Sequence, residues 1–194
     1  MKKLLITGFE PFGGETSNPS WDAVCRLPDS INEYALTKLL IPVTFGQAAQ
    51  TVLSVAQELC PDVILCVGQA GGRDAVTPEL VGINLRYASI PDNSGAKPTD
   101  ERIVGEGENA YFSTLPVRKM AEAIKSVGIP SRVSYSAGAY VCNDVLYSLL
   151  HYYSKTETRV GFIHVPYSRS QSKEPSMELD DIVKALTVAI ENID

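Results

Sequence analysis

Short apolar runs alternate with segments of helical spacing along this chain. The predicted strands cover residues 3–7, 35–43, 63–67, 132–135 and 161–165. Between them, apolar residues recur every three or four positions, which predicts helices. The predicted helices start near Asn18 and Phe45, cover 116–127, follow residue 140, and occupy 179–190. Strands that alternate with helices predict an α/β fold, a three-layer α/β/α sandwich with a largely parallel, twisted sheet.

The organisation of the chain is typical of one domain over residues 1–194. A length of 194 residues fits a single hydrophobic core. No internal repeat or linker interrupts the pattern, and Pro42 predicts that the second strand ends near a sheet edge or kink. Residues 90–109, rich in proline, glycine and charge, predict one long loop. Loops of this length are often functional.

Charge and hydropathy exclude several classes of partner. The formal net charge is -6, and no basic stripe is present, so a nucleic-acid partner is not expected. The first apolar run covers only residues 4–6 before Gly8, which is too short for a signal peptide. No stretch approaches the length of about 20 apolar residues that a membrane helix needs. We therefore expect a cytoplasmic protein without a membrane partner.

The chain contains four cysteines and two histidines, and their spacing argues against metal binding. No C-x-x-C pair occurs, so neither a metal site nor a cofactor is predicted. In the cytoplasm the thiols stay reduced. Cys25, Cys60 and Cys66 lie in helix or strand patterns and are expected to fill the core.

Cys142 is the cysteine with a chemical context. The sequence SAGAYVCN, at positions 136–143, joins a predicted strand to a predicted helix and places Cys142 near the start of that helix. Free N–H groups and the helix dipole stabilise an anion there, which predicts a lowered pKa for this thiol. The same N–H groups can hold an oxyanion during acyl transfer.

A nucleophilic cysteine needs a base, and only two histidines are available. His151 lies nine positions after Cys142, about 180° around the helix, and so faces the wrong way. His164 ends a predicted strand, where catalytic groups of α/β sheets gather. A carboxylate usually orients such an imidazole. Glu79 and Asp92 are both candidates, and spacing alone does not separate them.

Glycine-rich loops offer an alternative function. The sequence VGQAGGR at positions 67–73 follows a predicted buried strand and could cradle a phosphate, with Arg73 assisting. It is not G-x-G-x-x-G, and no loop has the Gly-Lys-Ser/Thr of a P-loop. A phosphate-binding transferase is therefore a weak alternative.

Several ordered segments together resemble the pyroglutamyl peptidase I (pyrrolidone-carboxylate peptidase) family over nearly the whole chain. They are TGFEPFGG (7–14), NP (18–19), VGQAGGR (67–73), TPE (77–79), IPDNSG (90–95), AYFSTLP (110–116), SAG (136–138), VCN (141–143) and GFIHVPY (161–167). The resemblance implies a cysteine peptidase that removes N-terminal pyroglutamate through a thioester. It assigns the catalytic roles to Cys142, His164 and Glu79, and so favours Glu79 over Asp92.

The resemblance also implies a small apolar pocket for the pyroglutamate ring. Its residues here would be Phe9, Phe12, Gln69, Ile90, Tyr140 and Val141. A lactam has no charged amine, so an apolar pocket with a few polar groups can select it. The expected partners are peptides with N-terminal pyroglutamate, and the family's tetramers imply a homotetramer.

Two positions depart from the family pattern. Leu80 stands where the family usually has arginine, and Ser89 replaces an arginine expected near the active centre. Arg86 is near in sequence, but strand alternation does not place positions 86 and 89 on one face. The departures motivate a second hypothesis, a weak or inactive homologue that binds pyroglutamyl peptides without cleaving them.

Overall fold

A six-stranded sheet forms the middle layer of the computed structural model, which describes residues 1–194. Its order is β2-β3-β1-β4-β8-β5. Four strands run parallel, namely β3 (Tyr34–Ile41), β1 (Lys2–Phe9), β4 (Val63–Gln69) and β8 (Arg159–Val165). The two-residue strands β2 (Ser30–Ile31) and β5 (Thr77–Pro78) are antiparallel at the two edges. The carboxyl ends of β1, β4 and β8 therefore lie side by side at the same end of the sheet.

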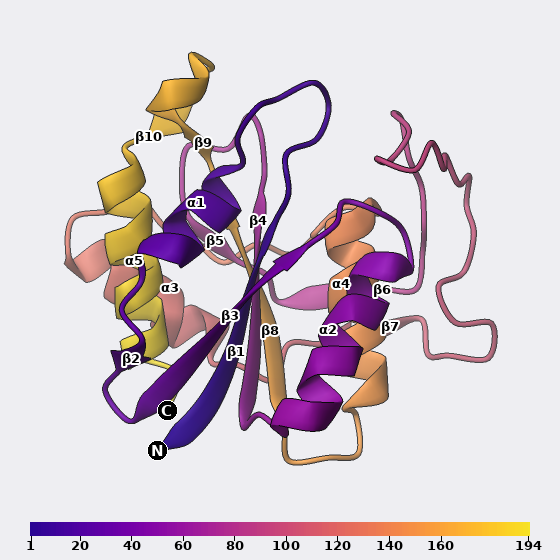
Figure 1. Ribbon diagram of the computed structural model, residues 1–194, viewed down its shortest axis with the longest axis horizontal. Helices are drawn as coiled ribbons and strands as arrows, with labels where there is room; N and C mark the ends of the chain where they lie inside the picture. The colour runs from indigo at the N-terminus through magenta and orange to yellow at the C-terminus, as the bar shows by residue number, and fades with distance from the viewer.

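Helices cover both faces of the sheet (Figure 1). One face carries α1 (Pro19–Arg26), α3 (Val117–Ser126) and α5 (Leu179–Glu191), and the other carries α2 (Gln47–Leu59) and α4 (Val141–Tyr152). Two separate apolar clusters, of 24 and 18 buried residues, fill the two spaces between helices and sheet. The three-layer α/β/α prediction is confirmed. None of the helices is long and apolar enough to span a membrane.

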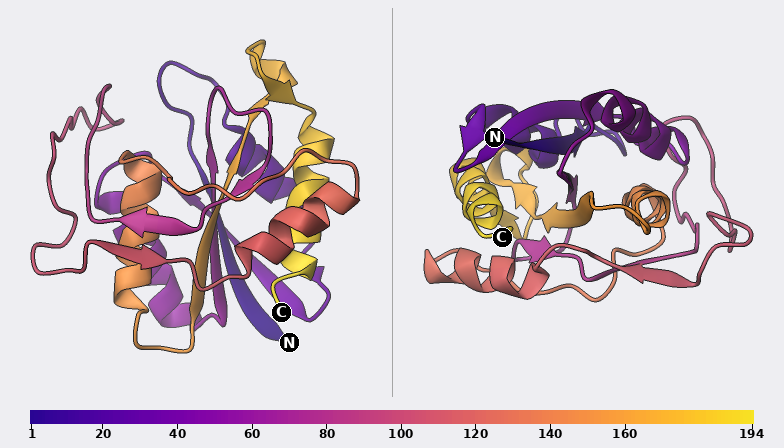
Figure 2. Two further views of the ribbon diagram at one scale, coloured as in Figure 1. Left: turned by 180° about the vertical axis from the view of Figure 1, so that it is seen from behind. Right: turned by 90° about the horizontal axis from the view of Figure 1, so that it is seen from below.

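Two small units lie outside the main sheet, a strand pair with its long connecting loop and an arm after β8. Strands β6 (Val81–Ile83) and β7 (Ala110–Phe112) form an antiparallel pair against α4 (Figure 2). The predicted long loop is part of the connection between them. After β8, strand β9 (Tyr167–Ser168), the 3-10 helix η1 (Arg169–Gln171) and strand β10 (Ser176–Met177) form an arm that extends past the strand ends (Figure 1).

The segment predicted as a strand at 132–135 is not a regular strand. It pairs with the neighbourhood of β5 only through isolated bridges, Val76 with Ser131 and Glu79 with Ser134. Pro78 has no N–H group, so a continuous ladder is not possible there. The segment still fixes Glu79, because the next residue, Leu80, donates its N–H to the Ser134 carbonyl at 2.8 Å.

The core prediction was wrong for two of the three cysteines. Cys66 is fully buried in β4, but Cys25 and Cys60 are exposed. Cys25 lies on the outward face of α1, and Cys60 caps α2 in a left-handed conformation that turns the chain outward. An apolar helix pattern does not determine the orientation of one residue at its end.

Candidate active site

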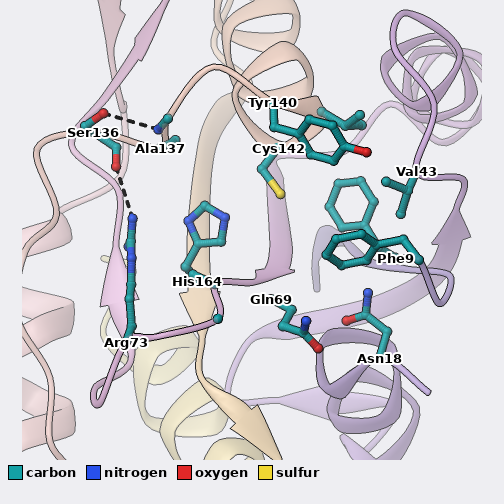
Figure 3. Close-up of a pocket in the computed structure, with 15 residues that line it drawn as sticks. Phe9, Asn18, Val43, Gln69, Arg73, Ser136, Ala137, Tyr140, Cys142 and His164 are labelled. Atoms are coloured by element: carbon teal, nitrogen blue, oxygen red, sulfur yellow. Dashed lines mark hydrogen bonds between the residues drawn. The ribbon is translucent and has the colours of Figure 1, made fainter. Parts of the chain in front are cut away.

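A cavity of about 360 Å³ opens at the carboxyl ends of the central strands (Figure 3). Phe9 from β1, Gln69 from β4 and His164 from β8 line it, together with Cys142 from α4. Crevices at the carboxyl ends of parallel strands are the usual binding sites of α/β sheets. The fold therefore brings together residues from four distant parts of the chain.

Cys142 is the second residue of α4, as the sequence predicted. The N–H groups of Val141, Cys142 and Asn143 form no backbone hydrogen bond, because they precede the first helical pairing. The buried Asn143 side chain accepts from Ile83 N–H at 2.9 Å and donates to the Ile83 carbonyl at 2.9 Å. These bonds fix the start of the helix against β6 and leave free donors beside the Cys142 sulfur.

His164 and Glu79 form a buried pair. The imidazole Nδ1 lies 2.7 Å from Glu79 Oε1, and both side chains are almost completely shielded from solvent. The antiparallel pairing of β5 with β8 explains the contact, since it sets Thr77 opposite His164 and carries Glu79 alongside. Because Nδ1 is engaged by the carboxylate, Nε2 is left for the cavity, which the Cys142 side chain also lines (Figure 3).

Arg73 binds the same carboxylate oxygen as His164. Its guanidinium donates to Glu79 Oε1 at 2.7 Å and to Thr77 Oγ1 at 2.5 Å. A further bond of 3.1 Å reaches the Ser136 carbonyl, in the loop that leads to Cys142 (Figure 3). These bonds commit Arg73 to internal partners, which removes the cation that the phosphate-binding alternative required.

Burial and the local charges set the resting protonation states. Burial alone would raise the pKa of Glu79, but the bond from His164 and the charge of Arg73 outweigh it and lower this pKa. Burial lowers the pKa of His164, against the opposing effect of Glu79. Burial, followed by the Glu79 charge, raises the pKa of Cys142 to about 12. The resting site therefore holds a carboxylate, a neutral imidazole and a thiol.

The raised pKa of Cys142 corrects the prediction made from the helix start. The helix N-terminus and Arg73 both favour a thiolate, yet the cost of burying the charged sulfur is larger. A thiolate is expected only when His164 takes the proton and becomes a cation beside it. These pKa directions favour proton transfer within the pair over a preformed thiolate.

Five of the six predicted pocket residues line the cavity. Phe9, Phe12, Gln69, Tyr140 and Val141 are among its lining residues. Ile90 is not: its side chain is 47% exposed, on the loop after β6. Asn18 and Val43, which the sequence reasoning did not select, line the cavity as well. The sequence pattern assigned Asn18 only to the start of a helix and Val43 only to the end of a strand.

The alternative carboxylate, Asp92, has a different role. One of its oxygens accepts from Ser94 N–H at 2.9 Å and Ala96 N–H at 2.8 Å, and the other accepts from Phe45 N–H at 2.9 Å. It is not among the residues that line the cavity. Asp92 therefore organises its own loop and joins it to the segment before α2.

The positions that depart from the family pattern do not disturb the buried pair. Leu80 is partly buried and Ser89 is exposed. Arg86 does not replace the missing arginine, because its Nε donates to the buried Asp144 Oδ1 at 2.5 Å.

An α/β sandwich with a thiol, an imidazole and a carboxylate at the strand ends defines the class of thiol-dependent hydrolases. A family model described as pyroglutamyl peptidase matches residues 2–194. The chain therefore belongs to the pyroglutamyl peptidase family, as the sequence resemblance implied.

Similar proteins match along almost their whole length. The pyrrolidone-carboxylate peptidase of Thermosipho africanus is 49% identical, over 98% of this chain and 96% of that protein. The Bacillus subtilis protein of the same name is 48% identical, over 97% of this chain and 90% of its own. The crystal structure of pyroglutamyl peptidase I from Bacillus amyloliquefaciens has a TM-score of 0.96 and 44% identity, covering 99% of this chain and 94% of that one.

Proposed function

We propose that this chain is a cysteine peptidase that removes N-terminal pyroglutamate from peptides, with Cys142, His164 and Glu79 as its catalytic residues. The 2.7 Å contact between His164 Nδ1 and Glu79 Oε1 carries the proposal, because it fixes the tautomer with Nε2 free as a base. The names of the similar proteins support pyroglutamate as the residue removed.

The reaction would proceed through a thioester. His164 Nε2 takes the proton from the Cys142 sulfur as the sulfur bonds to the carbonyl carbon of the pyroglutamyl residue. The carbonyl oxygen becomes an oxyanion, which the free N–H groups at the start of α4 can stabilise. The intermediate collapses, and His164 gives its proton to the leaving amine. Water then attacks the thioester, with His164 taking its proton and returning it to sulfur.

Glu79 would act through His164 during both steps. The imidazole becomes a cation each time it accepts a proton, and the buried carboxylate stabilises that cation. The lowered pKa of Glu79 keeps it ionised throughout the neutral range. Arg73 holds the same oxygen, so the carboxylate cannot rotate away between steps.

The cavity would select the ring by the absence of charge. Its volume of about 360 Å³ leaves room for a five-membered lactam with its attached carbonyl, and about half of its lining residues are apolar. An N-terminal ammonium would lose its hydration between Phe9 and Val141 without gaining a carboxylate partner.

The hypothesis of an inactive binding homologue is not favoured. It rested on Leu80 and Ser89, and neither lies between the thiol, the imidazole and the carboxylate. The similarity to proteins named as peptidases supports the enzyme instead.

Turnover of pyroglutamyl p-nitroanilide tests the proposal directly. The reduced wild-type protein should release nitroaniline, and Cys142→Ser should not. Trapping with acid during turnover should add the mass of one pyroglutamyl group to the wild type at Cys142. A folded, reduced protein that neither turns over nor becomes labelled would contradict the proposed function.

Three broader expectations accompany this function. Residues 1–194 would form one catalytic domain, which the match over 2–194 supports. A cytoplasmic location would keep the Cys142 thiol reduced. A homotetramer is implied by the family resemblance, and light scattering of the purified protein measures it.

A further inference from the structure

The arm after β8 contacts the pocket through two amide side chains. Gln171, the last residue of η1, donates from Nε2 to Gln69 Oε1 at 2.9 Å. The same nitrogen lies 3.4 Å from Glu15 Oε2, on the loop after β1. Gln171 is therefore placed where the arm, that loop and the pocket meet.

The orientation of the Gln171 side-chain amide, oxygen against nitrogen, is fixed by a group that can only donate. Its Oε1 accepts from the backbone N–H of Ser168 at 3.0 Å, as half of a capping box. A backbone N–H can only donate, so the atom facing it is the amide oxygen of Gln171. The Gln171 nitrogen then faces Gln69 and the Glu15 carboxylate, both of which accept.

The polarity of Gln69 is fixed in turn. Because Gln171 presents a donor, Gln69 turns its oxygen toward the arm, and its NH₂ group is left for the cavity. Figure 3 shows the Gln69 nitrogen on the side nearer to Cys142 and the oxygen turned away. Asn18, the other amide in the cavity, has its oxygen engaged by Ser20 and gives one N–H to the Glu10 carbonyl at 3.0 Å, which leaves its second N–H. This edge of the cavity therefore offers N–H donors.

We propose that Gln171 is a positioning residue that fixes the Gln69 amide so that its NH₂ group meets the ring carbonyl of the lactam. The inference rests on the proposed function and adds to it a residue that never touches the substrate. The Ser168 N–H fixes the orientation of the Gln171 amide, and the Gln171 amide fixes the orientation of the Gln69 amide in the pocket. A ring that lacks the carbonyl leaves this donor unpaired in a partly buried site, and is disfavoured.

The substitution Gln171→Glu reverses the polarity at nearly the same shape, and it also sets a second carboxylate beside Glu15, an effect that the Gln69→Leu background described below separates from the change in polarity. Glutamate serves as well as glutamine in the capping box, so the arm keeps its bond to Ser168 N–H. Its second oxygen accepts but cannot donate, which turns the Gln69 nitrogen toward the arm and its oxygen into the cavity. We expect KM for pyroglutamyl p-nitroanilide to rise about 10- to 100-fold, the effect of one mispaired hydrogen bond, with kcat changed by less than about 3-fold.

Four comparisons separate this role from general damage. Gln171→Met removes the hydrogen bond that orients the Gln69 amide without favouring the opposite orientation. It should therefore raise KM less than Gln171→Glu. Gln171→Glu should have no further effect in a Gln69→Leu background. The inhibition constant of cyclopentanecarboxamide, which has the ring but no lactam carbonyl, should not change. Arg169→Gln removes only an exposed ion pair to Glu178 on the same arm, and should leave all constants unchanged.

The inference is overturned by an unchanged KM in Gln171→Glu, by equal effects of Gln171→Glu and Gln171→Met, or by an effect that persists without Gln69. Thermal unfolding of each variant verifies that the arm and domain are folded. Wild-type turnover is measured first. Its absence would reject the proposed function, whereas normal wild-type turnover with an unchanged variant would reject only the role of Gln171.

Discussion

Gly68 lies directly against Cys142: a Cβ atom at position 68 would be 3.0 Å from the Cys142 sulfur. The same atom would be 2.7 Å from the Phe162 ring. Real Cβ atoms almost never approach that closely, so any side chain here must displace the sulfur or the ring. The absence of a side chain at position 68, next to the carboxyl end of β4, therefore leaves room for the thiol.

Gly68→Ala should lower kcat by about 10-fold, because the new methyl group displaces the Phe162 ring and pushes the adjacent reacting sulfur out of its position. Steady-state kinetics on pyroglutamyl p-nitroanilide measures the effect. Gly105→Ala is the matched control, since a Cβ there meets no atom within 4 Å. Equal activity of the two variants would show that the sulfur is not held by this contact.

Glu79→Gln should lower kcat about 100-fold with little change in KM. The amide oxygen can still accept from His164 Nδ1, so the tautomer is retained and only the charge that stabilises the imidazolium is lost. Asp92→Asn serves as the comparison, because it removes the other candidate carboxylate. It should weaken the loop and lower thermal stability while kcat falls far less. If kcat fell more in Asp92→Asn than in Glu79→Gln, Asp92 and not Glu79 would be the catalytic carboxylate.

The acid limb of kcat/KM should lie below pH 6.5. His164 must be neutral to accept the thiol proton, and burial lowers its pKa from the ordinary value of 6.5. Lowering the pH through this shifted pKa protonates the imidazole and removes the base, so activity falls only in more acidic solution. A pH profile of kcat/KM checks the position, and an inflection above pH 6.5 would contradict it.

Arg73→Gln should move that acid limb to higher pH. The guanidinium charge lowers the pKa of His164, so its removal makes the imidazole easier to protonate. The glutamine is too short to restore all three bonds of Arg73, and kcat should fall as well. The matched control is Arg132→Gln, whose guanidinium pairs with Asp74 outside the cavity. It should leave the profile unchanged, and a shift of equal size in that control would refute the local charge effect.

The buried pair of Arg86 and Asp144 should be a major stability element. Asp144 is fully buried, receives Arg86 Nε at 2.5 Å and accepts from Gly46 N–H at 2.7 Å. Arg86→Met leaves this charge without its partner, which typically costs about 3–5 kcal/mol. Urea unfolding measures the change. Arg132→Met breaks the exposed pair with Asp74 and should cause no measurable loss, so similar midpoints for the two variants would contradict the argument.

The features predicted correctly from sequence were those that local patterns determine. The apolar runs identified the four parallel strands and the spacing identified the five helices, because burial on one or both faces imposes a period. The start of α4 before Cys142 followed from the strand-to-helix junction. The same patterns gave the layers, because short strands alternating with helices have few ways to pack.

The remaining features depend on contacts that no local pattern encodes. Glu79 could not be preferred over Asp92 from spacing, because its position depends on the pairing of β5 with β8 across 85 residues. The pKa of Cys142 was misjudged because the helix start is visible in sequence, whereas the burial of the sulfur is not. Ile90 was placed in the pocket by motif position, but this residue is 47% exposed and is not among those that line the cavity.

The active site forms only when the carboxyl ends of β1, β4 and β8 lie side by side, so enzymatic activity reports on correct pairing of these strands. A chain that has collapsed or formed its helices, but in which these strands are not yet paired, does not bring the Cys142 thiol and the His164 imidazole together. Specific activity regained after dilution from denaturant should therefore follow the formation of distant strand contacts, and lag behind the recovery of helical signal.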